Sequence, residues 1–447
     1  MLSRRGFIRA GAASVGTLAL RPFGLLPALA QNGPDYRALV CVFLYGGNDS
    51  NNTIVPMDDT NYKSYLSIRG SLALQSGSLN PVTSVAGAPY GFHALLAEVA
   101  SMFSSKELAV VANVGSLVQP VTRAQYQAQQ APIPNNLFSH ADQQQQWQTS
   151  IAQGNSPTGW GGRLADYVAA NKLNSSTFPA FLSVAGNSLE GTGAKTSQVA
   201  VAPGQTLGLS GFGNNGPSQA RLNALTSLLT TNTGVTLAQS ANNVLSMGIN
   251  DAKALALALG QGTPLKTQFP ATTLGEQLQQ VAQIIQVRSA LGMNRQIFFC
   301  SVGSFDTHVN EFGTLNTLYP ELSQALAAFY SATQEMGVAN NVTTFTESDF
   351  NRTFQPTTTD GSDHAWGGHH LVLGGSVGGG QIYGSFPTFE LGGPSDTDTR
   401  GRWIPTTAID QYGATLCSWF GIPDSALSSI FPNLPNFGSS PKLTFLG

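Results

Sequence analysis

The chain has 447 residues and a formal net charge of −3, and only 10% of its residues are charged, against roughly 25% in typical soluble domains. Because 41% of the residues are hydrophobic and 9% are aromatic, disorder driven by charge is not expected. The 3 cysteines are too few for a disulfide scaffold, and the lack of a basic excess argues against a nucleic-acid binder.

Residues 1–30 are predicted to form a cleaved export signal. The segment SRRGFIR (residues 3–9) resembles a twin-arginine motif, and residues 28–30 have the small-x-small form of a signal-peptidase site, which predicts cleavage near Ala30. The alternative is a membrane anchor, but glycines, an arginine and a proline interrupt a segment shorter than the ~20 apolar residues that a span needs. We therefore expect the twin-arginine translocase as a partner during export, a periplasmic or secreted location, and no stable membrane anchor.

Continuous apolar runs in the rest of the chain predict buried strands. A run that is apolar on both faces is typical of a central parallel strand. Helical patterns lie between these runs, and the alternation predicts an α/β fold with a large, mostly parallel sheet and helices on both faces. The expected strands are 38–45, 108–113, 179–185, 296–302 and 342–346, and the expected helices are 218–229, 237–259, 274–291, 321–336 and 406–420.

The mature chain, residues 31–447, is predicted to be a single α/β domain. Residues 186–217 are rich in Gly, Ser, Thr and Asn, and a mostly helical block follows, so we expect an insertion over about 186–291. The glycine-rich stretch 374–380 lacks the Lys and Ser/Thr of a P-loop and is interpreted as a turn between strands. The three cysteines lie in apolar contexts and are interpreted as small buried hydrophobic residues rather than metal ligands.

Carboxylates and imidazoles collect just after the expected strands. In open α/β sheets, ligands bind beyond the carboxyl ends of the strands. Five of the six histidines lie in or near these segments, and only His93 lies elsewhere. The residues that follow the strands include Asp49 after the first, Asp306 and His308 after 296–302, and Asp349 and Arg352 after 342–346, with His364, His369 and His370 shortly beyond.

Carboxylate oxygens and neutral imidazoles together suit a divalent metal ion. The set therefore predicts a site for zinc, manganese or calcium, with Asp49, Asp306, His308, Asp349, His364 and His369 as the expected ligands. Such an ion can polarise an ester and activate water or a side-chain oxygen. The alternative for individual residues is plainer: the aspartates cap the helix or loop that follows, and the later histidines lie on a solvated turn.

Ser139 is predicted to start a helix, in the segment SHADQQQQW. A helix N-terminus carries partial positive charge and free N–H groups, which favour an oxygen nucleophile or the anion that it attacks. We expect Ser139 and Arg352 as catalytic residues, the first as nucleophile and the second as a bidentate ligand of an anion. The alternative is that Ser139 only caps the helix.

These segments resemble, in order along the chain, those of the bacterial domain-of-unknown-function 1501 proteins, which typically carry a twin-arginine signal. The resemblance implies a fold similar to the alkaline phosphatase and sulfatase superfamily, whose members hydrolyse or transfer phosphate and sulfate esters at a bimetal or calcium site. The matching segments are VFLYGGNDSNNTIVP, FSHADQQQQW, GWGGRLAD, SFDTH, SDFNRT, DHAWGGHHLVLGGSVGGGQIYG and IDQYGATLCSWFGI.

The same resemblance implies roles for single residues. Asp49 matches the superfamily's metal-ligating Asp at the end of the first strand, Ser139 its nucleophile at a helix start, and His364 or His369 its final histidine. Two positions depart from the pattern. One residue rather than two separates Asp306 from His308, and Asp349 is followed by Phe350 where the superfamily has a histidine.

Two function hypotheses follow from the sequence. The first is an exported metal-dependent hydrolase that acts on an anionic phosphate or sulfate ester. The second is a non-catalytic periplasmic binding or envelope-assembly protein that keeps the fold with a degenerate site. The departures from the superfamily pattern and the low charge favour the second hypothesis, and the cluster of polar residues at strand ends favours the first.

Overall fold

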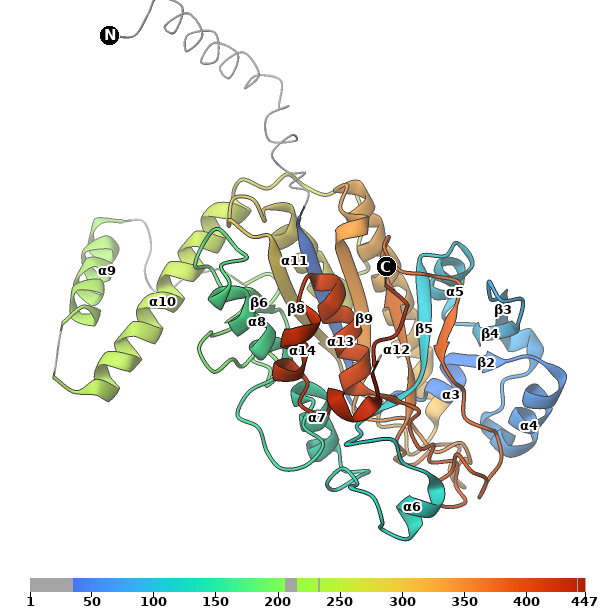
Figure 1. Cartoon of the computed structure of the whole chain (residues 1–447). Helices are drawn as coiled ribbons and strands as arrows, with labels where there is room; N and C mark the ends of the chain where they lie inside the picture. Colours follow the sequence, from blue (N-terminus) through green and yellow to red (C-terminus); the bar gives the residue numbers. More distant parts are fainter. Residues whose placement is uncertain (1–34, 206–214, 232–233, 440, 447) are drawn as a thin grey trace, which may run out of the picture.

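A computed structural model describes residues 35–205, 215–231, 234–439 and 441–446 (Figure 1). The export signal predicted over residues 1–30 lies outside the described residues. None of the helices in the described part of the chain combines the length and the apolar composition needed to cross a bilayer.

A 9-stranded sheet forms the centre of the structure, in the order β11-β5-β10-β9-β1-β8-β6-β7, with β12 paired to β5. All its strand pairs are parallel except those of β10, which runs antiparallel to both β5 and β9. This confirms the predicted α/β class. The strands are β1 (Arg37–Leu44), β5 (Leu108–Gly115), β6 (Phe181–Ser183), β7 (Val199–Ala200), β8 (Arg295–Val302), β9 (Val342–Ser348), β10 (Gly368–Leu373), β11 (Ile382–Gly384) and β12 (Thr407–Ala408).

The three central strands end at one level of the sheet. Strand β1 pairs in parallel with β8 on one side and β9 on the other, and Leu44 lies opposite both Val302 and Ser348. Every residue of β1 except Arg37 is buried, which is why its sequence is apolar on both faces. The loops that follow β1, β8 and β9 therefore leave the same edge of the sheet.

Helices cover both faces of the sheet. Figure 1 shows α8, α13 and α14 in front of it and α11 and α12 behind it. The helices are α3 (Ser50–Thr53), α4 (Asp59–Arg69), α5 (Ala97–Ser104), α6 (Arg123–Gln127), α7 (His140–Thr149), α8 (Trp160–Ala170), α9 (Gly216–Leu229), α10 (Thr236–Leu259), α11 (Thr273–Gln286), α12 (Glu311–Glu335), α13 (Ile409–Phe420) and α14 (Asp424–Ile430), with short 3₁₀ turns at 70–72, 76–78, 339–341 and 434–437.

The predicted strands and helices are all present, and the largest difference concerns α12. The sequence predicts a helix from residue 321, but α12 begins at Glu311 and continues through Pro320. Proline removes one backbone hydrogen bond and is favoured in the first turn of a helix, so its presence at position 320 makes a helix start near residue 321 plausible from sequence. The buried face of α12, which includes Leu315, Tyr319 and Leu326, shows how tertiary packing keeps the helix intact across the proline.

Strand β10 was not predicted, and it changes the setting of two histidines. The sequence predicts His369 as a metal ligand, with a solvated turn as the alternative for both histidines, but both lie in β10, where they are 3% and 4% exposed. The glycine-rich stretch 374–380 does connect β10 to β11, as predicted. All three cysteines are buried and free, which confirms their expected burial.

A small antiparallel sheet, which the sequence did not predict, lies beside the main sheet. Its order is β2-β4-β3, from β2 (Ile54–Pro56), β3 (Leu79–Thr83) and β4 (Pro89–His93). Figure 1 shows it next to β5, with α4 at its outer side. Helix α4 carries Arg69, which reaches the loop after β1, as described below.

Helices α9, α10 and α11 make up the helical block predicted in the middle of the chain. Figure 1 shows α9 and the first half of α10 projecting from the body of the molecule. Most of the exposed large hydrophobic residues of the described chain lie in this segment, among them Leu237, Val244, Met247 and Leu257. The boundaries of an insertion over residues 186–291 stay a prediction.

Asp410, in the first turn of α13, gives a pH-dependent prediction. It is 2% exposed and accepts the backbone N–H of Asn433, and burial raises the pKa of its carboxyl to about 7. A raised folded-state pKa means a stabilising contribution that is present below the unfolded pKa of ~3.9 and is lost as pH rises through 7. From pH 4 to pH 8, we expect the stability of the native protein to fall by roughly 4 kcal/mol relative to Asp410→Asn. Urea unfolding of both proteins across this range measures the difference, and a constant difference would contradict the assignment.

Candidate metal centre

Two glycines at the end of β1 let the loops from β8 and β9 come together. Gly46 has φ +111°, and a Cβ there would lie 2.5 Å from the backbone nitrogen of Asp306. Gly47 has φ +84°, and a Cβ there would lie 2.5 Å from the ring of Phe350. Because only glycine combines this backbone conformation with such close approach, the Gly46-Gly47 pair fixes how near the two loops lie.

Three histidines from three segments meet at this edge of the sheet, and each has its Nδ1 on an acceptor. His140, the first residue of α7, places Nδ1 2.7 Å from Asp349 Oδ2. His308, after β8, places Nδ1 3.2 Å from Asp363 Oδ1, and His364 places Nδ1 2.7 Å from the carbonyl oxygen of Phe138. Carboxylate and carbonyl oxygens only accept, so these partners assign the proton of each neutral ring to Nδ1. Each Nε2 is then left with a lone pair.

The three Nε2 atoms converge on the carboxylate of Asp306. His308 Nε2 lies 3.0 Å and His364 Nε2 lies 3.3 Å from Asp306 Oδ1, while His140 Nε2 lies 3.4 Å from Asp306 Oδ2. The Nε2 atoms of His308 and His364 are 2.9 Å apart. Four groups that only accept therefore face one another, and either a cation or an additional proton must lie among them.

A divalent cation fits this donor set better than a proton does. Burial is the main cause that lowers the pKa of His364, so a second proton on that ring is disfavoured at neutral pH. Donor atoms of His140, Asp306 and His364 all lie within 4.8 Å of one another, and His140 Nε2 is buried without a hydrogen-bond partner. Nitrogen donors with one carboxylate suit zinc or manganese, whereas calcium prefers an all-oxygen shell.

Arg352 holds Asp306 in place. Its guanidinium is fully buried, and Nη1 donates to Asp306 Oδ1 at 2.9 Å and to the Gly46 carbonyl at 3.3 Å. The remaining donors bond the hydroxyl and carbonyl oxygens of Ser362. Partial burial acts to raise the pKa of Asp306, but the hydrogen bond and charge of Arg352 and the neighbouring histidines lower it on balance. Arg352 thus keeps Asp306 ionised and is already occupied by the protein, whereas the sequence predicted that it binds an anion.

The carboxylate of Asp349 supports the histidines from outside. It is fully buried, and its Oδ2 accepts hydrogen bonds from His140 Nδ1 and from Gln144 Nε2, both at 2.7 Å. Carboxylates that hold the far nitrogen of a ligating histidine fix the tautomer and the direction of its ring. The structure therefore places Asp349 on the outer side of His140 as its support, whereas the sequence predicts Asp349 as a direct metal ligand.

Asp49 and His369 were expected among the ligands, and the structure places both elsewhere. Asp49 is buried in an ion pair with Arg69 of α4, which also lies 3.4 Å from Glu311. His369, buried in β10, accepts the backbone N–H of Asn113 at its Nδ1, and burial lowers its pKa to about 3. Both residues lie near strand ends in the sequence. In the structure, the buried Arg69 binds the side chain of Asp49, and the position of His369 within β10 directs its ring to Asn113.

Ser139 is the N-cap residue of α7, as predicted, but its side chain makes no capping hydrogen bond. Its hydroxyl donates instead to Asp142 Oδ2 at 2.6 Å. Hydrogen bonds from Asn136 and from Ser139 lower the pKa of Asp142. A carboxylate with a lowered pKa is a weak base, so this partner does not activate Ser139.

Residues 36–394 match the family model described as a protein of unknown function, DUF1501. The chain belongs to the DUF1501 family. None of the curated proteins matches it.

Solved structures show a distant likeness in fold to this DUF1501 protein. Ps i-CgsB is 7% identical, with 89% of this chain and 72% of that chain covered, at a TM-score of 0.35. A sulfatase from the glycosaminoglycan locus of Bacteroides thetaiotaomicron is 10% identical, with 89% and 74% covered and a TM-score of 0.34. The phosphonate monoester hydrolase of Agrobacterium radiobacter is 9% identical, with 87% and 74% covered and a TM-score of 0.30. Scores this low specify no chemistry.

Sequence reasoning on this DUF1501 protein missed three members of the centre. His140 was noted among the clustered histidines but was not placed among the ligands, and Asp363 and Gln144 were not singled out. A signal was present, because His140 and Gln144 are four residues apart and so lie on one face of a helix. Asp363 directly precedes His364 but serves His308, which no local spacing indicates.

Asp363→Ala tests the outer support of the centre. Asp363 accepts from His308 Nδ1 and pairs with Arg400 at 3.0 Å. Without this carboxylate His308 can rotate or carry its proton on Nε2, so we expect zinc affinity to fall about 10- to 100-fold. Isothermal titration with zinc measures the change. Asp142→Ala, which removes a carboxylate of α7 that bonds Ser139 and Asn136, is the matched control and should leave the affinity unchanged.

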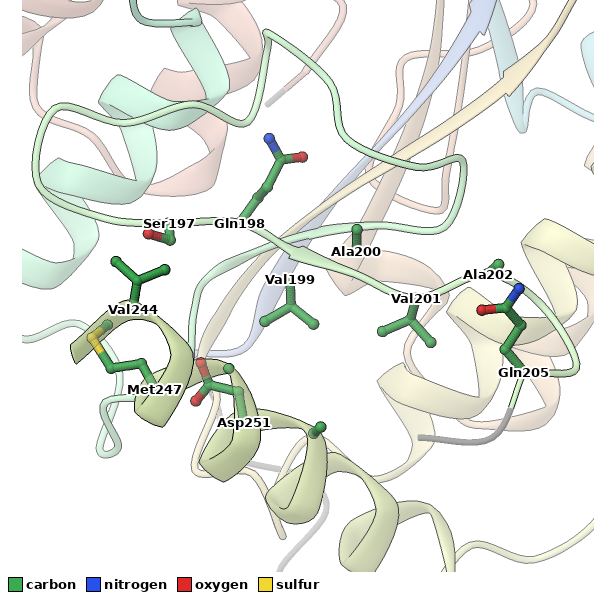
Figure 2. Close-up of a pocket in the computed structure, with 12 residues that line it drawn as sticks. Ser197, Gln198, Val199, Ala200, Val201, Ala202, Gln205, Val244, Met247 and Asp251 are labelled. Carbon is green, nitrogen blue, oxygen red and sulfur yellow. The ribbon is translucent and has the colours of Figure 1, made fainter. Parts of the chain in front are cut away.

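The cavity in Figure 2 lies away from this centre. It has a volume of about 370 Å³ and runs between the edge strand β7 and helix α10. Its walls are mostly apolar or uncharged, and Asp251 is the charged residue among the labelled side chains. It offers none of the convergent donors of the histidine cluster.

Proposed function

We propose that this DUF1501 protein is an exported metal-dependent hydrolase of phosphate or sulfate esters. The observation that carries the proposal is the convergence of three imidazole Nε2 atoms on Asp306, with every Nδ1 held by an acceptor. A divalent ion bound there supplies a Lewis acid that polarises an ester oxygen and activates water.

The surrounding residues divide the other tasks. His140, His308, His364 and Asp306 would bind the ion, and Arg352 keeps Asp306 ionised and aligned. Arg400 pairs with Asp363 but is one third exposed, so its free face can meet an anionic ester, whereas Arg352 is buried and bonded to Asp306 and Ser362. Ser139 stays the proposed nucleophile, and in that role its hydroxyl must leave Asp142 for a stronger base.

The test is metal analysis followed by an ester screen. We expect the purified mature protein to contain zinc or manganese and to hydrolyse p-nitrophenyl phosphate or p-nitrophenyl sulfate. His308→Ala and His364→Ala should lose both properties. A protein that contains no metal at this centre and does not respond to added zinc or manganese would rule out the proposal.

A second candidate is a non-catalytic binding or envelope-assembly protein. It is favoured by one observation, that Ser139 and Arg352 are both held by protein partners. This candidate predicts that the centre binds metal without turnover of either ester. It also predicts that Ser139→Ala leaves the metal affinity unchanged and that the native protein and this variant are equally inactive toward both esters.

We further propose export through the twin-arginine route, on the basis of the SRRGFIR segment. Replacing Arg4-Arg5 by Lys-Lys is expected to hold the precursor in the cytoplasm, because that route requires the paired arginines. Fractionation and immunoblotting of the precursor and mature forms measure the effect. Unchanged export of the double variant would show that another route is used.

A further inference from the structure

A second cluster of potential ligands lies inside the protein and is unrelated to the histidines. It contains Cys41 in the middle of β1, Glu347 near the end of β9, and Glu190 in the loop after β6. The thiol sulfur and one carboxylate oxygen of each glutamate all lie within 4.8 Å of one another. The three residues are 0%, 1% and 0% exposed, respectively.

Three of the four carboxylate oxygens of this cluster accept no hydrogen bond of normal geometry, although the Cys41 thiol lies beside both glutamates and the Trp160 N–H lies beside Glu347. Both oxygens of Glu190 and Oε2 of Glu347 are buried without a partner. Within the described residues, no lysine or arginine forms an ion pair with either glutamate. An unpaired carboxylate in a protein interior costs several kcal/mol, so two beside each other call for a compensating group.

The backbone around Glu190 is fixed with unusual closeness. Its carbonyl accepts the N–H of Gly162 at 2.7 Å, and its N–H donates to Gln148 Oε1 at 3.2 Å. A Cβ on Gly159 would lie 2.2 Å from the Glu190 carbonyl oxygen, and one on Gly162 would lie 2.2 Å from the backbone of Thr192. The absence of side chains at Gly159 and Gly162 therefore lets the loop that carries Glu190 pack directly against the start of α8, with the Glu190 side chain in the interior.

Protons or a cation can compensate these carboxylates. Burial raises the pKa of Glu190 to about 8, and burial together with the charge of Glu190 raises the pKa of Glu347. Protonation removes the charge, but each carboxylic O–H then needs an acceptor of its own. A cation satisfies all the donor atoms at once. One oxygen of Glu190, one of Glu347 and the sulfur of Cys41 supply three donors, and the fourth position of a tetrahedral site would be left to a water molecule.

We propose that Cys41, Glu190 and Glu347 form a buried structural site for a thiophilic divalent cation of the zinc class. The mixed thiolate and carboxylate donors suit zinc and disfavour magnesium or calcium. Because all three residues are shielded from solvent, the ion enters during folding and does not exchange with the native protein. The site gives Cys41 a role beyond that of a small buried hydrophobic residue.

Cobalt is the probe, because a thiolate ligand gives Co²⁺ a charge-transfer absorption band in the near ultraviolet. The full mature chain is unfolded with chelator and refolded with Co²⁺. We expect one cobalt per chain that shows the thiolate band and resists chelator in the native state. The band should persist in the His308→Ala/His364→Ala variant, which separates this site from the histidine cluster.

Matched cysteine variants decide the ligand. Cys41→Ser should abolish the band, whereas Cys300→Ser, which changes a buried thiol on the neighbouring strand β8, should keep it. The Glu190→Gln/Glu347→Gln variant keeps the shape of both side chains and should hold one zinc fewer per chain than the native protein. Refolded native protein with no thiolate band, or a band that survives Cys41→Ser, would overturn the proposal, and the first result does not depend on any variant folding.

Discussion

Zinc or manganese added to the chelator-treated protein is expected to raise its melting temperature, and His308→Ala or His364→Ala should abolish this response. The Nε2 atoms of the two histidines lie 2.9 Å apart, and with the protons on Nδ1 their lone pairs face each other. An ion that binds only the native state relieves this repulsion and stabilises the fold by about 2.7 kcal/mol at a hundredfold excess over Kd.

Thermal unfolding followed by circular dichroism, with and without added metal, measures this response. His93→Ala is the control, because His93 is buried against Phe312 and Tyr319, away from the centre. Its loss should lower the melting temperature of the apo protein but preserve the rise with metal. The side chains of Asp306 and His308 are 45% and 43% exposed, so chelator reaches this centre in the native protein. A melting curve indifferent to metal in the native sequence would contradict a metal centre here.

Arg69→Met is expected to destabilise the protein by about 3–5 kcal/mol. Arg69 lies in a fully buried network with Asp49 and Glu311, and its removal leaves two uncompensated carboxylates in the interior. Burial already raises the pKa of Glu311, and the nearby charge of Asp49 adds to it while Arg69 opposes it. Urea unfolding at neutral pH measures the loss.

A solvent-exposed ion pair provides the matched control. Lys442→Met removes the partner of Asp424, a pair whose side chains are 32% and 73% exposed, and should cost less than about 1 kcal/mol. The same network decides the role of Asp49. Asp49→Asn should weaken the fold but keep the melting response to zinc or manganese. If a folded Asp49→Asn protein no longer showed a rise in melting temperature with zinc or manganese, Asp49 would have to be a metal ligand.

Asp49 and Asp306 have similar sequence contexts but different partners in the structure. Both follow an apolar strand and both were expected to bind metal. Their distinction lies in arginines that come from distant parts of the chain. Arg69 of α4 forms a fully buried ion pair with Asp49. Arg352 binds one oxygen of Asp306, whose carboxylate stays 45% exposed and can still contact the histidines.

The α/β class, the central strands, the main helices and the edge of the sheet where Asp306, His308, Asp349 and His364 meet can all be predicted from the amino-acid sequence. These features depend on local hydrophobic pattern and on the common direction of parallel strands, and both can be seen along the chain. Which side-chain atoms face one another depends on the tertiary fold. The bonds from His140 to Asp349 and from His364 to Phe138 join residues 209 and 226 positions apart. Such pairs form because packing brings their loops together, and no periodicity encodes them.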